Sequence, residues 1–527
     1  YHGDGVEKDY SKAVEWWLKA AEKGYYGAQY NLGNCYYHGC GVEQNYNKAT
    51  EWWLKAAEQG YIKAQYSLGC CYYDGRGVGQ DYNKAVKWWF KAAEKGYIEA
   101  QYKLGNCYYN GISVSRDYVE AVKWYRRSVK FDNANAQCQL GWCYYCGYGV
   151  EQDYTEAVGW LLKASEQGNT EAQRFLGCCY HCGNGVGQDY SKAVEWWLKA
   201  AGQGDAVSQQ NLGVCYYHGN GVEQDYGKAV EWWLKAAEQG NIYAQCELGV
   251  CYYHGDGVEQ NYSKAVEWWL KAAGQGNASS QHNLGLCYYD GNGVEQDYGK
   301  AVEWWLKAAE KGDIKAQYLL GECYYLGLGV DKNYAEAVKW YSKVAKLHEY
   351  DIDSIYEINA QLGLGNCYYY GGHGLNRDYV KALKWYRESA EQGCANAQFY
   401  LSVCYYYGCG VDRDYVESVK WSFKAAKQGC VGAQFYLGVC CYYGHGINQD
   451  YAKAAKWSRK AAKQGCAGAQ FYLGNCYYNG NGIKQNYTEA ARWYRKAAEQ
   501  GHINAQYCLG NCYYIGSGLK QDYVKAT

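Results

Sequence analysis

The stretch that decides the fold is residues 28–60, AQYNLGNCYYHGCGVEQNYNKATEWWLKAAEQG. Its cysteine, Cys35, recurs every 36 residues along the 527-residue chain, apart from one step of 44 residues and one of 37. Fourteen units are marked in this way, and a tryptophan recurs with them from Trp16 to Trp493. Self-similarity at such a period indicates a solenoid, in which one small structural unit stacks on the next.

The first half of each unit has the pattern of an amphipathic helix. Ala28, Leu32 and Cys35 are spaced to lie on one helical face. Gly39 and Gly41 follow in a Gly-x-Gly-Val turn that repeats along the chain, and glycines in this place end a helix. We therefore expect a first helix in every unit, with the cysteine on its buried side.

The second half of each unit predicts a second helix. Asn45 is an N-cap type of residue and stands directly before a new apolar pattern over 49–57, which includes Trp52 and Trp53 on a single face. Gly60 closes the pattern. Such a hairpin cannot bury its apolar face alone, so its neighbours complete the core. The sequence thus predicts an all-α, right-handed α-solenoid of about fifteen 36-residue helix-turn-helix repeats.

Composition excludes several classes of protein. The chain has 66 glycines and no proline, and its 48% hydrophobic content argues against disorder. The net charge of −1 leaves no basic stripe for nucleic acid. No run of eighteen apolar residues occurs, so we expect no membrane insertion in this segment. The absence of methionine, with no polar cap at either end, predicts a slice of a longer array.

One irregular step divides the predicted array. Eight extra residues near 347–358 predict a change in the path of the chain, with repeats over 1–346 and again over 359–527 and an insertion or hinge between them. We interpret the extra residues as a solvated, acidic extension of the hairpin. Cation coordination is the alternative, and its candidate ligands are His348, Glu349, Asp351 and Asp353.

The 27 cysteines do not predict a disulfide framework. Their number is odd, and repeat layers stack about 8–10 Å apart, whereas a disulfide needs Cα atoms within about 7 Å. We interpret the repeated cysteine as a small buried hydrophobic residue. One cluster is different, because Cys178, His181 and Cys182 share a helical face and could bind zinc or copper, with Cys146 or His218 as a fourth ligand. The alternative is chance in a cysteine-rich chain.

The repeated pattern resembles a known family. Ala-Gln-x-x-Leu-Gly-x-x-Tyr-x-x-Gly-x-Gly-Val, then Asp-Tyr-x-Lys-Ala-x-x-Trp-x-x-Lys-Ala-Ala-x-x-Gly, is similar to the Sel1-like repeat of the tetratricopeptide-like superfamily over essentially the whole chain. The resemblance implies an adaptor or scaffold that assembles other proteins. A secreted, disulfide-bonded branch includes penicillin-hydrolysing members. Its cysteines would fall at Gln29 and Ala57, where no repeat of this chain has cysteine, so the resemblance does not extend to that branch.

A binding surface is expected on the first helices. In tetratricopeptide-like solenoids these helices line the concave side, and here the positions of Tyr30, Asn34 and Tyr37 share a face away from the core. Aromatic side chains recur there and suit recognition; the alternative is that the rings pack only against each other. The predicted partner-binding residues are Tyr30, Tyr37, Tyr66, Tyr73, Tyr102, Tyr109, Trp142, Tyr145, Tyr217, Tyr253, Tyr289, Tyr325, Phe399, Tyr406, Phe435 and Phe471. Gln29 is expected to satisfy backbone groups between layers.

These patterns favour a non-catalytic scaffold that binds peptides or proteins along an aromatic groove. No cofactor is expected, because the Gly-x-Gly turns follow helices and lack the lysine of a nucleotide-binding loop. No catalytic residues converge in a uniform array. The alternatives are an enzyme resembling the penicillin-hydrolysing proteins, or a metal-binding protein. The sequence names no compartment, and its unpaired cysteines favour a reducing, cytoplasmic one.

Overall fold

The computed structural model describes residues 9–346 and 354–526, and helices dominate this part of the chain. Each repeat contributes a first helix, here called an A helix, and a second, called a B helix. The A helices are α2 (Tyr26–His38), α4 (Ile62–Asp74), α6 (Ile98–Asn110), α8 (Ala134–Cys146), α10 (Thr170–Cys182), α12 (Ala206–His218), α14 (Ile242–His254), α16 (Ala278–Asp290), α18 (Ile314–Leu326), α20 (Ser354–Tyr370), α22 (Ala395–Tyr407), α24 (Val431–Tyr443), α26 (Ala467–Asn479) and α28 (Ile503–Ile515). The B helices are α1 (Tyr10–Glu22), α3 (Tyr46–Glu58), α5 (Tyr82–Glu94), α7 (Tyr118–Ser128), α9 (Tyr154–Glu166), α11 (Tyr190–Gly202), α13 (Tyr226–Glu238), α15 (Tyr262–Gly274), α17 (Tyr298–Glu310), α19 (Tyr334–Val344), α21 (Tyr379–Glu391), α23 (Tyr415–Lys427), α25 (Tyr451–Lys463), α27 (Tyr487–Glu499) and α29 (Tyr523–Ala526).

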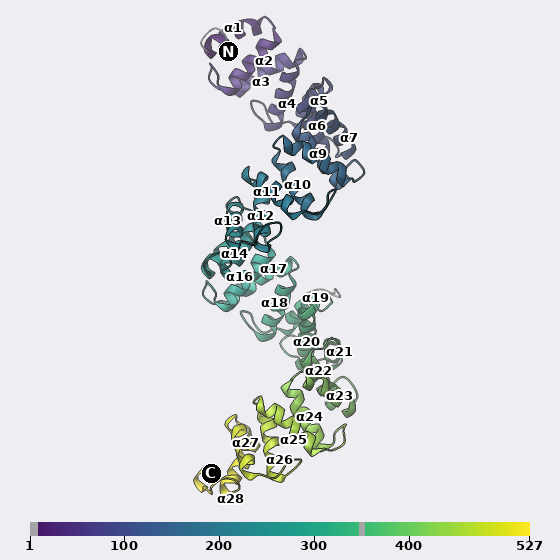
Figure 1. Cartoon of the computed structure of the whole chain (residues 1–527), viewed down its shortest axis with the longest axis vertical. Helices are drawn as coiled ribbons and strands as arrows, with labels where there is room; N and C mark the ends of the chain where they lie inside the picture. Colours follow the sequence, from purple (N-terminus) through teal and green to yellow (C-terminus); the bar gives the residue numbers. More distant parts are fainter. Residues whose placement is uncertain (1–8, 347–353, 527) are drawn as a thin grey trace. The chain divides into compact units, whose positions relative to one another are not determined.

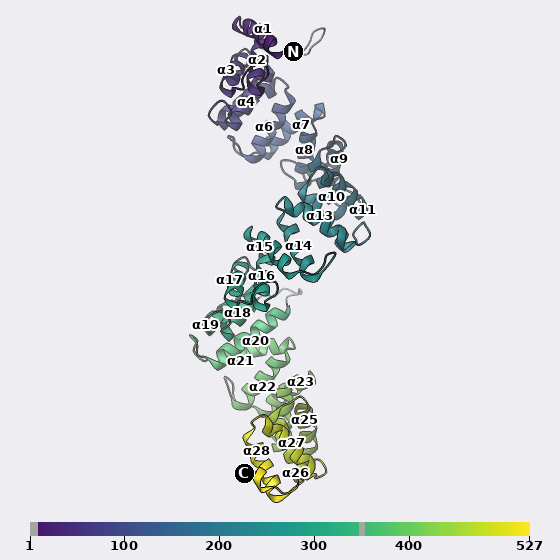
Figure 2. The same ribbon diagram turned by 90° about the vertical axis from the view of Figure 1, so that its left-hand side faces the viewer.

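The predicted all-α architecture of paired repeats is confirmed. A 3₁₀ turn (Val129–Phe131) extends α7, and the β-structure in the described part of the chain is one isolated bridge, between Gly372 and Leu375. The chain forms two units, Tyr1–Gln260 and Asn261–Thr527. Within each unit, a helix packs against the next helix along the chain (Figures 1 and 2). The predicted hinge at 347–358 lies partly outside the described residues and stays a prediction.

The helix ends follow the predicted capping chemistry. Asn45 Oδ1 accepts a hydrogen bond from the backbone N–H of Lys48 at 3.0 Å, which satisfies one donor at the start of α3. Gly39 ends α2 in the left-handed region at φ 73°, where glycine has no steric cost. Asp132 adopts the same region at φ 54° where the usual turn glycine is missing, and asparagine and aspartate are the side chains that tolerate it best.

A glycine on each A helix allows the two helices of a repeat to approach closely. A Cβ atom built on Gly33 would lie 2.4 Å from Cδ1 of Trp53 on α3, a distance that no side chain tolerates. Trp53 is only 4% exposed. The glycine therefore makes the recess that receives the large B-helix side chain, which explains why Leu-Gly recurs in the repeat.

The second glycine of each turn joins consecutive repeats. A Cβ atom on Gly41, which has φ 73°, would lie 2.5 Å from the backbone carbonyl of Tyr10 at the start of the preceding B helix. Gly77 approaches Tyr46 in the same way. The Gly-x-Gly turn is thus both the end of one helix and the contact that places it on the repeat before it.

The invariant glutamine of the A helix satisfies backbone groups between layers, as predicted. Gln29 Nε2 donates to the carbonyl of Ala21 at 3.1 Å, and Gln59 Nε2 donates to Gln29 Oε1 at 2.7 Å. The same arrangement links Gln65 to Ala57 at 3.1 Å. The side-chain amide of this glutamine therefore bonds to the end of the preceding B helix and links consecutive repeats.

The core of each repeat is small and apolar, and it includes the repeated cysteine. Cys35 and its thirteen equivalents are buried, at 3% exposure or less, which confirms their predicted role as core residues. Burial raises the pKa of the Cys35 thiol to about 11, so it stays protonated.

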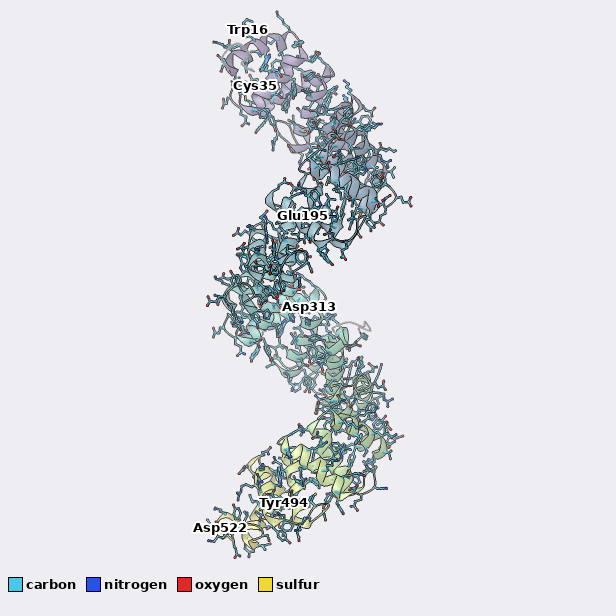
Figure 3. All side chains as sticks on the ribbon, in the orientation of Figure 1. Trp16, Cys35, Glu195, Asp313, Tyr494 and Asp522 are labelled. Atoms are coloured by element: carbon cyan, nitrogen blue, oxygen red, sulfur yellow. The ribbon has the colours of Figure 1, made fainter. Side chains whose placement is uncertain are left out.

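The two adjacent tryptophans of a B helix have different roles, although the sequence placed them on a single face. Trp53 packs with Leu68 and Cys71 of the next A helix, whereas Trp52 packs beside Leu32 and Cys35 of the A helix in its own repeat. Lys55 Nζ lies 4.1 Å from the Trp52 ring and covers its outer side. Trp16, on the first described helix, is 68% exposed (Figure 3).

Candidate functional site

The predicted binding residues line one side of the A helices, which we call the A-helix face: the positions of Tyr30, Asn34 and Tyr37 in every repeat. In the second repeat this face covers the inner tryptophan of α3. Trp53 Nε1 donates to the carbonyl of Tyr30 and to Asn34 Oδ1, both at 3.2 Å. The Tyr37 ring lies 5.2 Å from the Trp53 ring and 5.1 Å from that of Tyr46. The face therefore flanks the core instead of lying opposite to it.

All sixteen predicted partner-binding residues are half-buried. The tyrosines at the position of Tyr37 also reach into the next repeat through their hydroxyl groups. Arg76 donates to the Tyr37 hydroxyl at 2.8 Å, and Tyr217 donates to Asp256 at 2.9 Å. These rings hold adjacent repeats together, so their packing role accounts for their recurrence, and their role in binding stays a prediction.

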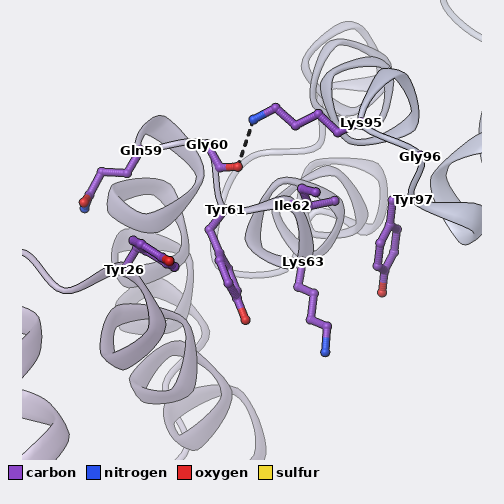
Figure 4. A pocket seen from close by; sticks show the side chains of 9 residues that line it. All are labelled: Tyr26, Gln59, Gly60, Tyr61, Ile62, Lys63, Lys95, Gly96 and Tyr97. Atoms are coloured by element: carbon purple, nitrogen blue, oxygen red, sulfur yellow. Dashed lines mark hydrogen bonds between the residues drawn. The ribbon is translucent and has the colours of Figure 1, made fainter.

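The A-helix face of the first three A helices is aromatic and continues into a cavity. The rings of Tyr30 and Tyr61 lie 5.0 Å apart, and those of Tyr26 and Tyr61 lie 5.2 Å apart. Tyr66 and Tyr97 form the equivalent pair one repeat later, at 5.0 Å. A cavity of about 510 Å³ is lined by Tyr26, Tyr61 and Tyr97 at the N-terminal ends of α2, α4 and α6. In Figure 4 the side chains of Tyr61, Lys63 and Tyr97 point to the same side.

An exchange of residue type at the helix N-cap makes the aromatic wall. Tyr61 and Tyr97 occupy the N-cap positions of α4 and α6 and make no side-chain capping bond. The equivalent residue of α8 is Asn133, whose Oδ1 accepts from the Ala136 N–H at 2.8 Å. At these two caps the chain thus has half-buried tyrosine rings in place of a capping interaction that typically contributes about 1 kcal/mol.

The cavity is neutral and aromatic on its walls and cationic at its rim. Lys63 is exposed, and Lys95 Nζ donates to the carbonyl of Gly60 at 2.9 Å (Figure 4). Burial, with a smaller effect from Glu99, raises the pKa of Tyr97 to about 12. The Tyr97 phenol therefore stays protonated at physiological pH and can donate a hydrogen bond.

The A-helix face changes character along the chain. The position of Tyr30 is taken by Arg174 in α10, which pairs with Asp205 at 3.1 Å, and by phenylalanine from α22 to α26. Two neighbouring tyrosines there, Tyr407 and Tyr443, are 58% and 52% exposed. The predicted aromatic groove is therefore not uniform, because aromatic stretches in each unit are separated by polar repeats.

Two groups of site residues were missed in the sequence. The N-cap tyrosines Tyr61 and Tyr97 escaped attention because they fall between helices, outside any helical periodicity. The tyrosines that directly follow the phenylalanines, Tyr436 and Tyr472, belong to a position that is polar in many of the earlier repeats. The signal that could have found both groups is aromatic substitution at positions where many other repeats have polar side chains.

The predicted metal cluster is not assembled, which corrects that expectation. Cys178 packs against the core of the repeat that contains Leu212, and the His181 ring lies 5.2 Å from Tyr190 and 5.5 Å from Trp197. Cys182 is exposed beside them. No group of three His, Cys, Asp or Glu side chains in residues 9–346 and 354–526 is arranged to hold a metal. The candidate ligands His348, Glu349, Asp351 and Asp353 lie outside the described residues.

A histidine and a carboxylate meet between two repeats in the second unit. His282 Nδ1 on α16 lies 3.4 Å from Asp313 Oδ1, and Asp313 also caps α18 by accepting from the Ala316 N–H at 2.7 Å. Burial of the carboxyl opposes its charge, but the His282 ring and the Ala316 N–H outweigh this effect and lower the pKa of Asp313. The pair is a polar link where other repeats use aromatic rings.

Comparison with known proteins places these features in a family. The family described as Sel1 repeat matches residues 1–25, 27–61, 62–97, 98–130, 134–169, 170–205, 206–241, 242–277, 278–313, 314–348, 358–394, 395–430, 431–466, 467–502 and 503–527. A protective antigen of uropathogenic Escherichia coli with the same type of fold is 32% identical over 94% of this chain and 97% of that one, with a TM-score of 0.59. A Sel1 repeat protein from Oxalobacter formigenes is 32% identical over 58% of this chain and 88% of that one, with a TM-score of 0.46.

Two further searches gave negative results. A search of the curated proteins finds no match. Among the described helices, none combines the length and the apolar character needed to cross a membrane.

Proposed function

The chain belongs to the Sel1 repeat family, whose tetratricopeptide-like fold is typical of protein-binding scaffolds, and from this premise we propose that it is a non-catalytic scaffold for peptides or proteins. The binding surface of this proposal is the A-helix face. Its best-defined part is the cavity at the N-terminal ends of α2, α4 and α6. The single observation that supports it most is the exchange of capping residues for the half-buried tyrosines Tyr61 and Tyr97, which line the cavity.

This exchange favours binding over packing as the purpose of the rings. Asparagine at the same position caps α8 and α10. The fold therefore accepts a stabilising side-chain cap at this position, and α4 and α6 lack it. Large aromatic side chains that forgo such a contribution and line a cavity are typical of recognition sites. The rings offer apolar area, and their hydroxyl groups can bond to the backbone of a ligand.

The geometry suits an extended peptide better than a compact small molecule. The tyrosine pairs repeat from one A helix to the next, so successive side chains of a peptide can meet equivalent sites. The residue at the position of Asn34 changes to Cys70 and Asn106 in the next repeats and can select among peptides. Many modest contacts along one rigid surface then add up to useful affinity.

The test replaces the tyrosines by the residue that stands at equivalent caps. The double variant Tyr61→Asn with Tyr97→Asn removes the aromatic wall and supplies two side-chain caps, so it should fold as well as the natural chain. A random peptide library displayed on phage is selected on the natural protein. Selected peptides are expected to lose about tenfold or more in affinity for the double variant, as for loss of interface hot spots.

A matched control removes a tyrosine from elsewhere in the same unit. Tyr243 on α14 is 67% exposed, and Tyr243→Asn should leave the selected peptides bound. Circular dichroism and the thermal midpoint verify that all variants are folded. Peptides that bind the double variant and the natural protein equally would place the binding surface elsewhere and contradict the proposal.

The enzyme alternative has a direct test. The positions of the disulfide-forming cysteines in the penicillin-hydrolysing branch are Gln29 and Ala57, and both are buried and engaged in repeat packing. We expect no saturable hydrolysis of nitrocefin by the purified chain. Saturable turnover that survives further purification would overturn the non-catalytic assignment.

A further inference from the structure

A second cavity lies on the B-helix side of the first unit, away from the A-helix face. It has a volume of about 550 Å³ and lies along α5, with contributions from the preceding repeat. Its apolar walls include Leu54, Trp88 and Phe90, and Phe90 is 44% exposed. In most sister helices the residue at the position of Phe90 is leucine, so this helix presents a larger apolar surface than they do.

Three lysines of α5 surround this apolar surface. Lys84, Lys87 and Lys91 all line the cavity and are exposed. Lys84 lies 3.5 Å from the capping carboxylate Asp81, and Lys91 Nζ lies 4.1 Å from the Trp88 ring. Lys87 makes no ion pair with any residue that the structure describes.

The same three positions are charge-compensated in almost every other B helix. Glu195 takes the place of Lys87 in α11 (Figure 3), and Glu51 and Glu231 do so in α3 and α13. A few of the other B helices keep a lysine at the position of Lys87; in α7, Glu120 pairs with this lysine, Lys123, at 2.7 Å. Among the full-length B helices, α5 and α25 alone carry lysine at all three positions.

We propose that the α5 cavity binds a short acidic peptide segment that inserts an aromatic or aliphatic side chain. The apolar walls accept the inserted side chain, and the three lysines pair with carboxylates on either side of it. Charge complementarity selects this partner, because the cavity combines an apolar floor with three lysines at its rim, of which Lys84 alone has an ion pair among the described residues. The site is separate from the A-helix face, so it does not depend on the proposed function of that face.

The extent of the positive charge argues against two other anionic partners. Nucleic acid requires a basic stripe that follows its backbone, whereas the adjacent helix α3 carries Glu51 and Glu58. Anionic membranes attract convex amphipathic surfaces, whereas the apolar residues here line a concavity. A ligand that contacts three lysines on one helix needs to be only a few residues long.

The probe for the test is a fluorescein-labelled peptide, Asp-Glu-Asp-Trp-Leu-Asp-Glu-Asp. Its anisotropy is titrated with the full chain at low and at physiological ionic strength. Binding should weaken as salt rises, because exposed charges are screened over about 8–10 Å. A second peptide with Ser in place of Trp and Leu should bind at least tenfold more weakly, because it has no side chain for the cavity.

Two substitutions introduce residues of the sister helices, so both variants are expected to fold. Lys87→Glu should weaken the peptide about fivefold to tenfold, and Phe90→Leu about threefold, as for changes at an exposed charge and at an apolar anchor. The matched control is Lys456→Glu, which makes the same charge change on α25, the other helix with three lysines, and should leave the affinity unchanged.

Several results would overturn the proposal. An affinity that is unchanged in Lys87→Glu would mean that the peptide does not bind at Lys87. An affinity equally reduced in Lys456→Glu would mean that the peptide responds only to net charge. Equal binding of the serine peptide would exclude insertion into the cavity. Tighter binding of a twenty-nucleotide single-stranded DNA, or of phosphatidylserine-containing vesicles, with the same sensitivity to Lys87→Glu, would assign the cavity to a different partner.

Discussion

The repeats of α2–α5 and of α22–α25 fill the same space by different means. In the first region the inner B-helix residue is a buried tryptophan, and the ring of Tyr37 lies 5.2 Å from Trp53. In the second region that residue is a buried serine, Ser422, and the ring of Tyr406 lies 4.9 Å from Tyr436. Tyr436 belongs to the next A helix, α24, so the ring that completes one repeat there comes from its successor.

This difference concerns how strongly adjacent repeats depend on each other. Where a repeat carries its own tryptophan, the ring packs on the A helix of that repeat as well as on the next A helix. Where the ring comes from the next repeat, opening one repeat also removes a packing partner from the one before it. In a linear array, stability is approximately a sum of terms within repeats and terms between neighbours. The second region therefore has more of its stability between repeats than the first region has.

The largest expected effect comes from removing the internal tryptophan. Trp53→Ser should destabilise the α2–α3 repeat by about 3–5 kcal/mol, because it leaves a cavity and unpairs Asn34. Hydrogen exchange of the backbone amides, resolved by repeat, measures this loss of protection. In the second region, Tyr436→Ser should lower protection in two repeats, α22–α23 and α24–α25. Protection lost from only one repeat would contradict the comparison.

A second substitution tests whether a tyrosine from the next A helix can replace the B-helix tryptophan in the core. Ser67 on α4 stands at the position equivalent to Tyr436. The double variant Trp53→Ser with Ser67→Tyr should recover about 1–2 kcal/mol of the loss, which a double-mutant cycle on the same amides measures. Additive effects of the two substitutions would mean that the new ring does not enter the vacated space.

The next effect in size concerns the helix glycines. In Gly33→Ala the new methyl group meets the buried Trp53 ring at 2.4 Å, so we expect a loss of about 2–3 kcal/mol. In Gly438→Ala the nearest atom is the Ser458 hydroxyl oxygen at 2.6 Å, which can rotate away, and alanine favours the helix by about 1 kcal/mol. Thermal unfolding should show a clear drop for the first variant and little change for the second. Equal decreases in the thermal midpoint of the two variants would show that the Trp53 ring does not cause the loss of stability in Gly33→Ala.

The smallest effect concerns the polar link between α16 and α18. Because the pKa of Asp313 is lowered in the folded chain, its contribution is complete above the pKa of an unfolded aspartate, about 3.9, and is lost as pH falls through the folded value. We expect roughly 0.5–1 kcal/mol of local stability to disappear between about pH 5 and pH 2. Asp313→Asn retains a capping side chain and should remove this pH dependence in hydrogen exchange of α16–α18. An unchanged pH profile would exclude the pair as its source.

The sequence predicted those features that one repeat determines by itself. The helices, the Asn45 cap, the turn glycines and the buried Cys35 all depend on spacing within 36 residues, and all are confirmed. Features that depend on the neighbouring repeat were predicted less well. Helical periodicity places Trp52 and Trp53 on the same face and does not reveal that Trp52 packs on the A helix of its own repeat and Trp53 on that of the next repeat.

The candidate site shows the same limit. Tyr37 and its equivalents were expected to face a partner, but periodicity could not show that Arg76 or Asp256 of the following repeat would meet their hydroxyl groups. The metal hypothesis failed for the same reason. Residues i, i+3 and i+4 on a helix are neighbours in isolation, yet Cys178 is taken up by the core of the next repeat.

The buried cysteine of each cysteine-marked repeat can report when that repeat unfolds. Burial raises the pKa of Cys35 to about 11 and of Cys179 and Cys440 to about 12, so these thiols react with an alkylating reagent only after the surrounding helices separate. Since each cysteine-marked unit contains such a thiol at the same depth, the order in which peptides become alkylated records the order in which repeats open. The array thus contains, without any added label, a readout of where its unfolding begins.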